Sequence, residues 1–197
     1  RATSTAPTVD KVDTDDTKVG GTGVAGATIE VTLPDGTKKT TTVGQNGKWE
    51  VALDAPLTKD AEVKVVQKEA DKKPSGEAAT TVVPTTADQV TPKAPENKVK
   101  VDNPAKLTDE EKAKVAEEVK KANPDLPAGT TVEVADNGDV TITYADKSVD
   151  TIPAANTVEE RETSGAPTVD KVDTDDTKVS GTGVAGVRAG GSVREEL

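Results

Sequence analysis

The chain contains no cysteine and no histidine, and these absences remove several kinds of chemistry. Disulfides and thiolate nucleophiles need cysteine, and an imidazole base needs histidine, so none of them is available. Zinc sites built from these two residue types are excluded for the same reason. Methionine and phenylalanine are also missing. A chain without oxidisable sulfur favours an exposed, extracellular setting.

Large apolar residues are scarce and charge is abundant. Val, Leu, Ile and Phe make up about 19% of the 197 residues, and 36 acidic against 25 basic side chains give a formal net charge of -11. This combination is typical of disordered proteins. Most apolar residues, however, are valines that alternate with Thr, Lys or Glu, which is the pattern of strands with one buried face. We therefore expect a folded, mainly β protein with small cores.

The acidic balance also limits the partners of the chain. Negative charge repels phosphates and anionic lipids, so we expect no nucleic-acid partner and no membrane insertion. No apolar run approaches the roughly 20 residues of a membrane span, and no signal peptide is visible. The chain does not begin with Met, so we expect a fragment of a longer protein.

The two ends of the chain repeat each other. Residues 161–186 match residues 1–26 at 23 of 26 positions. The differences are Ala2 against Glu162, Thr5 against Gly165, and Gly20 against Ser180. After Gly186 the copy breaks off, because Val187 and Arg188 stand where the first copy has Ala27 and Thr28. A unit of about 160 residues is too long for a helical or blade repeat and indicates a cassette of whole domains.

Proline divides this unit into two modules. Three prolines lie between residues 84 and 97, and proline cannot donate a ladder hydrogen bond. We predict an Ig-like β-sandwich over residues 5–86 and a Pro-rich linker over 87–94. A small α+β module follows over 95–158, and residues 159–197 begin a second, truncated copy.

The first module has seven candidate strands, which predict a β-sandwich. They span residues 8–12, 18–24, 28–33, 38–43, 48–53, 62–68 and 78–83. A three-residue loop, Gln45 to Gly47, predicts a hairpin with Val43 opposite Trp49. Trp49, the only tryptophan, has two interpretations, a core anchor or a platform for stacking sugars. Its place in an alternating strand favours the core.

The second module combines one helix with short strands. Thr108 and Glu111 form a capping box, and Pro124 ends the predicted helix after Asn123. A hairpin around residues 136–138 places Val134 opposite Val140, and Val132 opposite Ile142. With strands at 98–101 and 148–152, this pattern predicts one helix on a three- to four-stranded sheet.

The densest carboxylate cluster comprises Asp10, Asp13, Asp15 and Asp16, which recur as Asp170, Asp173, Asp175 and Asp176. Hard oxygen ligands in a loop are what calcium requires, so these four are candidate calcium ligands. A solvated acidic loop with Lys11 and Lys18 nearby is the alternative interpretation. We expect no other cofactor. Nothing singles out a catalytic pair among the acids, so we expect no enzyme activity.

Several motifs resemble known families. Residues 6–9, 21–29, 34–37 and 44–49 (Gly-Gln-Asn-Gly-Lys-Trp) are similar to the bacterial Ig-like repeats of large surface adhesins, including biofilm-associated proteins. Residues 140–153 resemble the strand-turn-strand segment in repeats of Gram-positive wall-anchored proteins, including the Rib and alpha-like group. Ala145 and Lys147 stand there where Pro and Gly are usual.

The resemblance implies a non-catalytic tandem-repeat stalk segment of an adhesin. Such a segment lies outside the cell on a Gram-positive wall, projects a binding domain and supports adhesion in biofilm. Its implied partners are neighbouring repeats in the same chain, together with homophilic or host-matrix contacts. The resemblance also implies calcium at module junctions, where it stiffens the rod. A module that binds a host matrix protein or a glycan is the alternative function.

Overall fold

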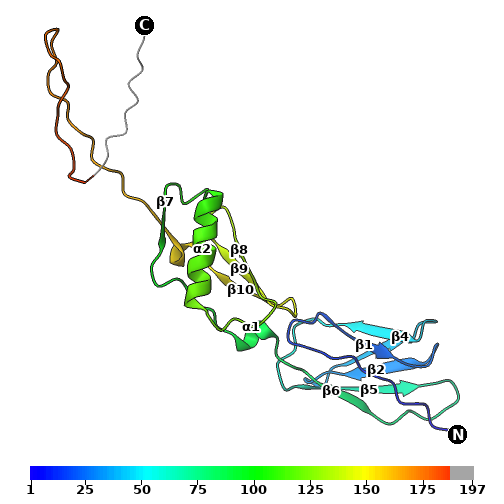
Figure 1. Cartoon of the computed structure of the whole chain (residues 1–197). Helices are drawn as coiled ribbons and strands as arrows, with labels where there is room; N and C mark the ends of the chain where they lie inside the picture. Colours follow the sequence, from blue (N-terminus) through cyan, green and yellow to red (C-terminus); the bar gives the residue numbers. More distant parts are fainter. Residues whose placement is uncertain (187–197) are drawn as a thin grey trace.

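The computed structural model describes residues 1–186, and these form two modules followed by an extended segment (Figure 1). Each module has its own cluster of buried apolar side chains. The first cluster runs from Val12 to Val82 and the second from Val99 to Val158. Figure 1 shows the two modules end to end, with the N-terminus at the outer end of the first.

The first module consists of Ig-like antiparallel sheets. Its strands are β1 (Lys18–Thr22), β2 (Thr28–Thr32), β3 (Lys38–Thr42), β4 (Lys48–Ala52), β5 (Glu62–Lys68) and β6 (Ala78–Thr81). Four of them form a sheet in the order β3-β2-β5-β6, and β1 pairs with β4. The mainly β prediction is therefore confirmed.

Alternation along the strands builds the core of this module. In β5, Val63 and Val65 are fully buried while Glu62 and Lys68 are exposed. In β4, Trp49 and Val51 point inward in the same way. Burying each valine contributes about 1.5–3 kcal/mol, so these short strands depend on packing between the sheets.

The predicted hairpin between β3 and β4 is wrong. Val43 donates to the carbonyl of Ala27 at 2.9 Å and accepts from Gly26 at 2.9 Å, which extends the pairing of β3 with β2. Trp49 lies opposite Gly21 in β1. The loop of residues 45–47 thus carries the chain from one sheet to the other. This route lets Val43 and Trp49 both reach the core, one from each sheet.

Residues 8–12, predicted as a strand, form no regular strand. Thr8 donates to the carbonyl of Thr22 and Asp10 to that of Gly20, both at 2.9 Å. This close approach depends on Gly21, because a Cβ there would lie 2.0 Å from the carbonyl oxygen of Thr8. The first segment therefore lies against β1 as an irregular edge.

The second module packs one long helix on small sheets. Its elements are α1 (Thr86–Gln89), β7 (Val99–Val101), α2 (Asp109–Ala122), β8 (Thr131–Val134), β9 (Val140–Thr143), β10 (Val149–Ile152), the 3-10 helix η1 (Ala154–Asn156) and β11 (Val158–Glu160). Strands β8, β9 and β10 form one antiparallel sheet, and β7 pairs in parallel with β11. The single sheet of the prediction is therefore divided in two, because the unpredicted β11 takes β7 as its partner.

Local predictions in this module are confirmed. Val132 lies opposite Ile142, and Val134 opposite Val140. The Thr108 hydroxyl accepts from the Glu111 amide at 3.2 Å, and the Glu111 carboxylate accepts from the Thr108 amide at 2.9 Å. These reciprocal bonds are the predicted capping box.

The segment predicted as a linker, residues 87–94, is not a free tether. It contains most of α1, and Ala87, Val90 and Ala94 pack against the second core. Residues 161–186 carry the beginning of the repeated copy, and the rest of its predicted extent, 187–197, lies outside the described residues.

Within residues 1–186, none of the helices combines the length and the apolar character needed to cross a membrane.

Candidate functional site: the junction between the modules

Backbone bonds fix the acidic loop at the end of the first module that faces α1. Val83, at the end of the first module, donates to the carbonyl of Val12 at 3.0 Å. Thr14 donates to the carbonyl of Val83 at 3.2 Å, and Asp13 and Val83 form an isolated parallel bridge. The acidic loop is thus fixed beside the strand end that leads into α1.

The N-terminus of α1 continues this connection. Thr85 is the N-cap of α1, and its amide donates to the Asp88 carboxylate at 3.0 Å. The same carboxylate accepts a hydrogen bond from the hydroxyl of Thr14, in the first module. The bonds from Thr14 and Thr85 lower the pKa of Asp88. An ionised Asp88 therefore links the first module to α1.

Asp146, in the turn between β9 and β10, holds α1 from the other side. Its carboxylate accepts from the amide of Thr86 at 2.7 Å and from its hydroxyl at 2.8 Å. The Ser148 hydroxyl donates to Asp146 at 2.6 Å and accepts from the Ala87 amide at 3.0 Å. The bonds from Ser148, and then those from Thr86, hold the pKa of Asp146 well below its usual value.

Asp15 faces carboxylates of both modules. Its pKa is raised by partial desolvation and then by repulsion from Asp13, Asp88 and Asp146. This repulsion opposes the bonds described above. The junction is therefore held by hydrogen bonds that act against a local excess of negative charge.

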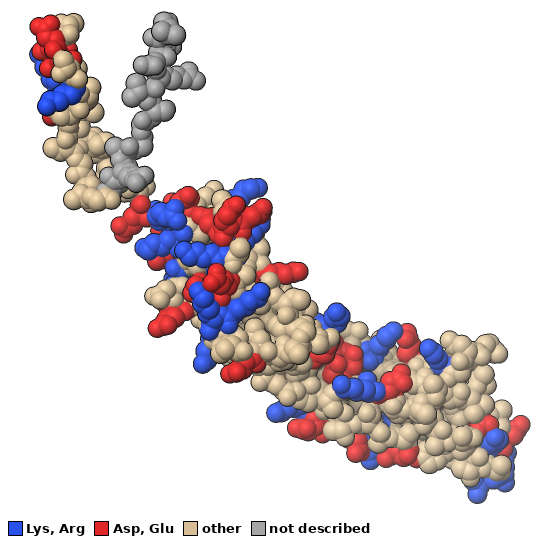
Figure 2. Space-filling view, viewed as in Figure 1, with Lys and Arg blue, Asp and Glu red and all other residues tan. Residues whose placement is uncertain are grey.

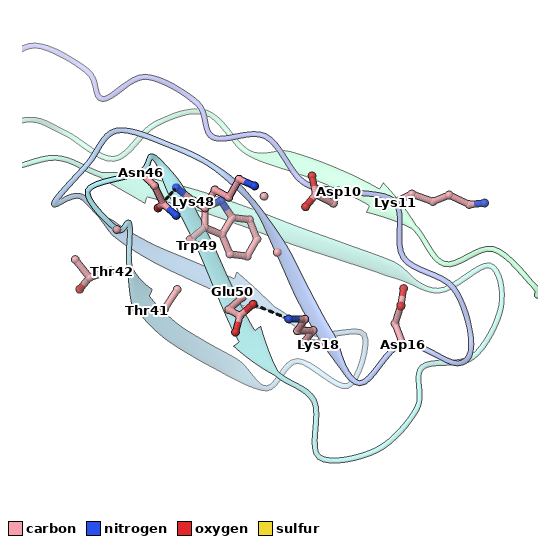
Figure 3. A pocket seen from close by; sticks show the side chains of 13 residues that line it. Asp10, Lys11, Asp16, Lys18, Thr41, Thr42, Asn46, Lys48, Trp49 and Glu50 are labelled. Atoms are coloured by element: carbon pink, nitrogen blue, oxygen red, sulfur yellow. Dashed lines mark hydrogen bonds and ion pairs between the residues drawn. The ribbon is translucent and has the colours of Figure 1, made fainter. Parts of the chain in front are cut away.

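The candidate calcium ligands have roles in the turn itself. Asp16 accepts from the amide of Asp13 at 2.8 Å, and Asp13 accepts from the amide of Asp15 at 3.0 Å. Asp10 precedes this turn in sequence, and it lines a groove together with Asp16 (Figure 3). In the part of the chain that the structure describes, no three carboxylates are placed to hold a metal ion. Calcium binding by these four residues and the alternative of a solvated acidic loop both stay predictions.

The groove in Figure 3 measures about 570 Å³ and lies over β1 and β4. Trp49 contributes to its wall but is only 4% exposed, and its indole N–H donates to the carbonyl of Thr22 at 3.2 Å. Lys18 pairs with Glu50 across the groove at 2.8 Å. The interpretation of Trp49 as a core anchor is confirmed, because the ring offers no free face for a sugar.

At the far end of the second module, Arg161 is bonded to residues 100–102. The amide of Arg161 donates to the carbonyl of Val101 at 2.8 Å, and its guanidinium pairs with Asp102 at 2.5 Å. It also donates to the carbonyl of Lys100 at 3.1 Å. Arg161 is the counterpart of Arg1, so the first residue of the new copy is attached to the preceding module.

Sequence patterns did not predict the residues that bond to or within α1 at the junction, which are Thr14, Thr85, Asp88 and Asp146. Thr85 and Asp88 have the spacing of a capping box, which was a usable signal for α1. Asp146 sits in a turn with an ordinary local role, and nothing near Thr14 in the sequence marks its bond to Asp88. Contacts between residues 74 positions apart have no local signature.

Comparison with known families identifies both modules. Residues 4–84 match the bacterial Ig domain and residues 90–161 match the atypical Rib domain. Both are repeat domains of bacterial surface adhesins. Comparison with curated proteins gave no match.

Solved structures with similarity include two adhesion-related proteins. The BSP domain of a biofilm associated protein is 25% identical with a TM-score of 0.39, and the match covers 42% of this chain and 14% of that one. The SrpA adhesin from Streptococcus sanguinis is 25% identical with a TM-score of 0.40, covering 81% of this chain and 97% of that one. By its two family matches, the chain carries a bacterial Ig domain followed by an atypical Rib domain.

Proposed function

We propose that the chain is a non-catalytic stalk segment of a bacterial surface adhesin, located outside the cell on a Gram-positive wall. Both domain families occur as adhesin repeats. The repetition of residues 1–26 at 161–186 supports serial copying of the two-module unit. In this role the segment holds a binding domain away from the wall.

The observation that carries the proposal is the bonded junction. The hydroxyl of Thr14, in the first module, donates to Asp88 of α1, and Ala87 of α1 packs against the second core. A flexible tether of the same length would let the modules fold back on one another. A junction with these bonds restricts bending, so each unit adds length in one direction.

The arrangement of the ends supports the same function. Figure 1 shows the N-terminus and the start of the second copy at opposite ends of the two-module body. The bonds of Arg161 to Val101 and Asp102 attach the beginning of the next copy to the second module. Strands rise about 3.3 Å per residue, so two such modules in line add several nanometres.

Surface charge suits a crowded array. Figure 2 shows acidic and basic side chains interspersed along the visible face of both modules. The formal net charge of -11 makes neighbouring stalks repel one another. The proposed partners of this stalk segment are therefore the adjoining repeats of its own chain.

A length series tests the proposal. One, two and four copies of residues 1–160 are placed between a wall anchor and a binding domain of known ligand, and reach is measured by force spectroscopy. Reach is expected to rise in proportion to copy number. A Gly/Ser linker of equal residue number is the control, since a coil grows only with the square root of its length. Equal behaviour of the two series contradicts the stalk.

The isolated chain is also tested on arrays of matrix proteins and glycans. The stalk function predicts no saturable binding. Saturable binding that a single loop substitution abolishes would instead support the ligand-binding function.

A further inference from the structure

Arg161 is the last residue that the second module holds. Its amide donates to the carbonyl of Val101 at 2.8 Å, which continues the parallel pairing of β7 with β11 by one residue. Its guanidinium donates to Asp102 at 2.5 Å and to the carbonyl of Lys100 at 3.1 Å. Beyond it, the described hydrogen bonds of residues 162–186 lie within the repeated copy. The chain leaves there, at the end of the second module that lies away from the first (Figure 1).

The first module holds its own N-terminal segment from the second residue onward. The carbonyl of Ala2 accepts from the amide of Lys73 at 2.8 Å, and Thr3 and Lys73 form an isolated parallel bridge. The amide of Ser4 donates to the carbonyl of Lys73 at 2.9 Å, and its hydroxyl accepts from the amide of Glu69 at 2.9 Å. The loop at the outer end of the module therefore fixes residues 2–4.

Alignment of the two copies leaves no free residue between these two sets of contacts. Arg161 is the counterpart of Arg1, and Glu162 is the counterpart of Ala2. The bond at position 2 uses a backbone carbonyl, which Glu162 also has, and positions 3 and 4 are identical in the two copies. Where a complete copy follows, residue 161 is held by one module and residue 162 by the next.

This spacing brings the two module ends together. Two residues of extended chain span at most about 7 Å, and paired strands lie about 5 Å apart. Thr163, two residues after Arg161, is the counterpart of Thr3, which pairs with Lys73. The backbone of Lys73 in the later copy therefore lies within about 12 Å of Arg161, a gap that long side chains on both surfaces can close.

Opposite charges lie on the two ends. The acidic first turn of α2, Asp109–Glu111, lies beside Arg161, because the Glu111 carboxylate accepts from the amide of Asp102 at 3.0 Å. The loop at the outer end of the first module, residues 68–73, carries three lysines and two acids, and Lys73 is exposed. Attraction between exposed charges at this distance is modest and screened by salt, but it favours one orientation of the two ends.

We propose that the second module of one copy and the first module of the next form a direct contact, with Lys73 of the later copy against the acidic first turn of α2. This inference rests on the proposed serial stalk and identifies the surfaces through which adjoining copies meet. The chain then has no flexible point at the boundary between copies.

A two-copy chain, residues 1–160 followed directly by the full chain, tests the contact. Arg1 of the later copy there takes the place of Arg161. Because the sequence has no cysteine, spin labels attach only to the introduced Lys114→Cys in the earlier copy and Thr40→Cys in the later copy, both at exposed positions. Pulsed EPR is expected to give one narrow distance distribution. A Gly-Ser-Gly-Ser insertion before Arg1 is the control and is expected to broaden it. Equal widths with and without the insertion overturn the proposal.

Charge exchange in the same two-copy chain tests the surfaces. Lys73→Glu in the later copy places like charges together and is expected to broaden the distribution. Adding Glu110→Lys in the earlier copy is expected to narrow it again. The matched control is Lys73→Glu in the earlier copy, where this lysine lies at the outer end and the width is expected to stay unchanged. Equal broadening from either copy, or a distribution that Glu110→Lys does not narrow, overturns the assignment of these surfaces.

The proposed function is judged by separate measurements. Saturable ligand binding on the arrays, or reach that does not grow with copy number, would reject the stalk. A broad distance distribution in the two-copy chain rejects only the contact between copies.

Discussion

Gly21 shows that a missing side chain sets the path of the N-terminal segment. The carbonyl of Thr8 occupies the space where a Cβ at Gly21 would stand, at 2.0 Å. The φ of Gly21 lies outside the left-handed region. Glycine is therefore required here because two backbones approach closely, and not because of a special backbone conformation.

Gly21→Ala is therefore expected to destabilise the first module by more than about 2 kcal/mol, since a backbone carbonyl cannot move aside as a flexible side chain does. The matched control is Gly76→Ala, because a Cβ there meets nothing within 4 Å. Chemical denaturation of both variants measures the difference. Equal stability of the two variants would contradict the packing described here.

Residue-level prediction from the sequence succeeded where a local pattern decides the outcome. Trp49 lies in an alternating strand, and the structure buries it. The same pattern could not assign Gln67, which reads as polar yet is fully buried because backbone groups of Thr5 and Val24 satisfy its amide. Those partners lie more than forty residues away in sequence, beyond any local pattern.

At the scale of elements, the turn between β9 and β10 carries local strain. Lys147 has a φ of 72°, in the left-handed region where a side chain is disfavoured. The families that this segment resembles have glycine at the corresponding position. The preceding residue, Asp146, accepts two hydrogen bonds from Thr86 of α1.

Lys147→Gly is expected to stabilise the second module by about 1 kcal/mol, since glycine adopts this φ without steric cost. Lys147→Ala is the control, because it removes the same charged side chain and keeps the strain. Thermal melts compare the two variants. A gain in Lys147→Ala as large as that in Lys147→Gly would assign the effect to charge instead of backbone conformation.

The sequence predicts some pairings of strands correctly and misses others. The β8–β9 register follows from loop length and alternation over a dozen residues, and its prediction is confirmed. The capping box of α2 is equally local. The β1–β4 pairing joins strands about 30 residues apart through the opposite sheet, so a short connecting loop suggested the wrong partner for β4. The β7–β11 pair was missed because β11 crosses the predicted module boundary.

At the scale of the whole molecule, acid is expected to loosen the junction. The pKa values of Asp88 and Asp146 are lowered in the folded state by bonds that favour their ionised forms. Such groups stabilise the fold above their ordinary pKa of 3.8, and this contribution is lost as the pH falls toward the lower folded value. Asp15 acts in the opposite sense, since its raised pKa means that protonation relieves repulsion.

The melting temperature is therefore expected to change little from pH 7 to pH 5 and to fall below about pH 4. The double variant Asp88→Asn/Asp146→Asn lacks both titrating groups and is expected to show a weaker fall. A melting temperature that rises below pH 4 would show that relief at Asp15 outweighs the two lost contributions.

Calcium provides a separate test of the acidic loop. Asp13 and Asp16 already accept backbone bonds within their turn, so we expect added calcium to leave the melting temperature unchanged. Titration calorimetry is expected to show no saturable heat. A calcium-dependent rise in melting temperature that Asp13→Asn abolishes and magnesium does not reproduce would support the metal site predicted from the sequence.

We expect the two modules to form one stiff unit through the contacts of Thr14, Asp88 and Asp146. Residual dipolar couplings of backbone amides in weakly aligned samples measure whether they do. A single alignment tensor is expected to fit the amides of residues 4–84 and 90–160 together. Separate tensors of clearly different magnitude for the two ranges would show that the modules move independently and that the unit is not stiff.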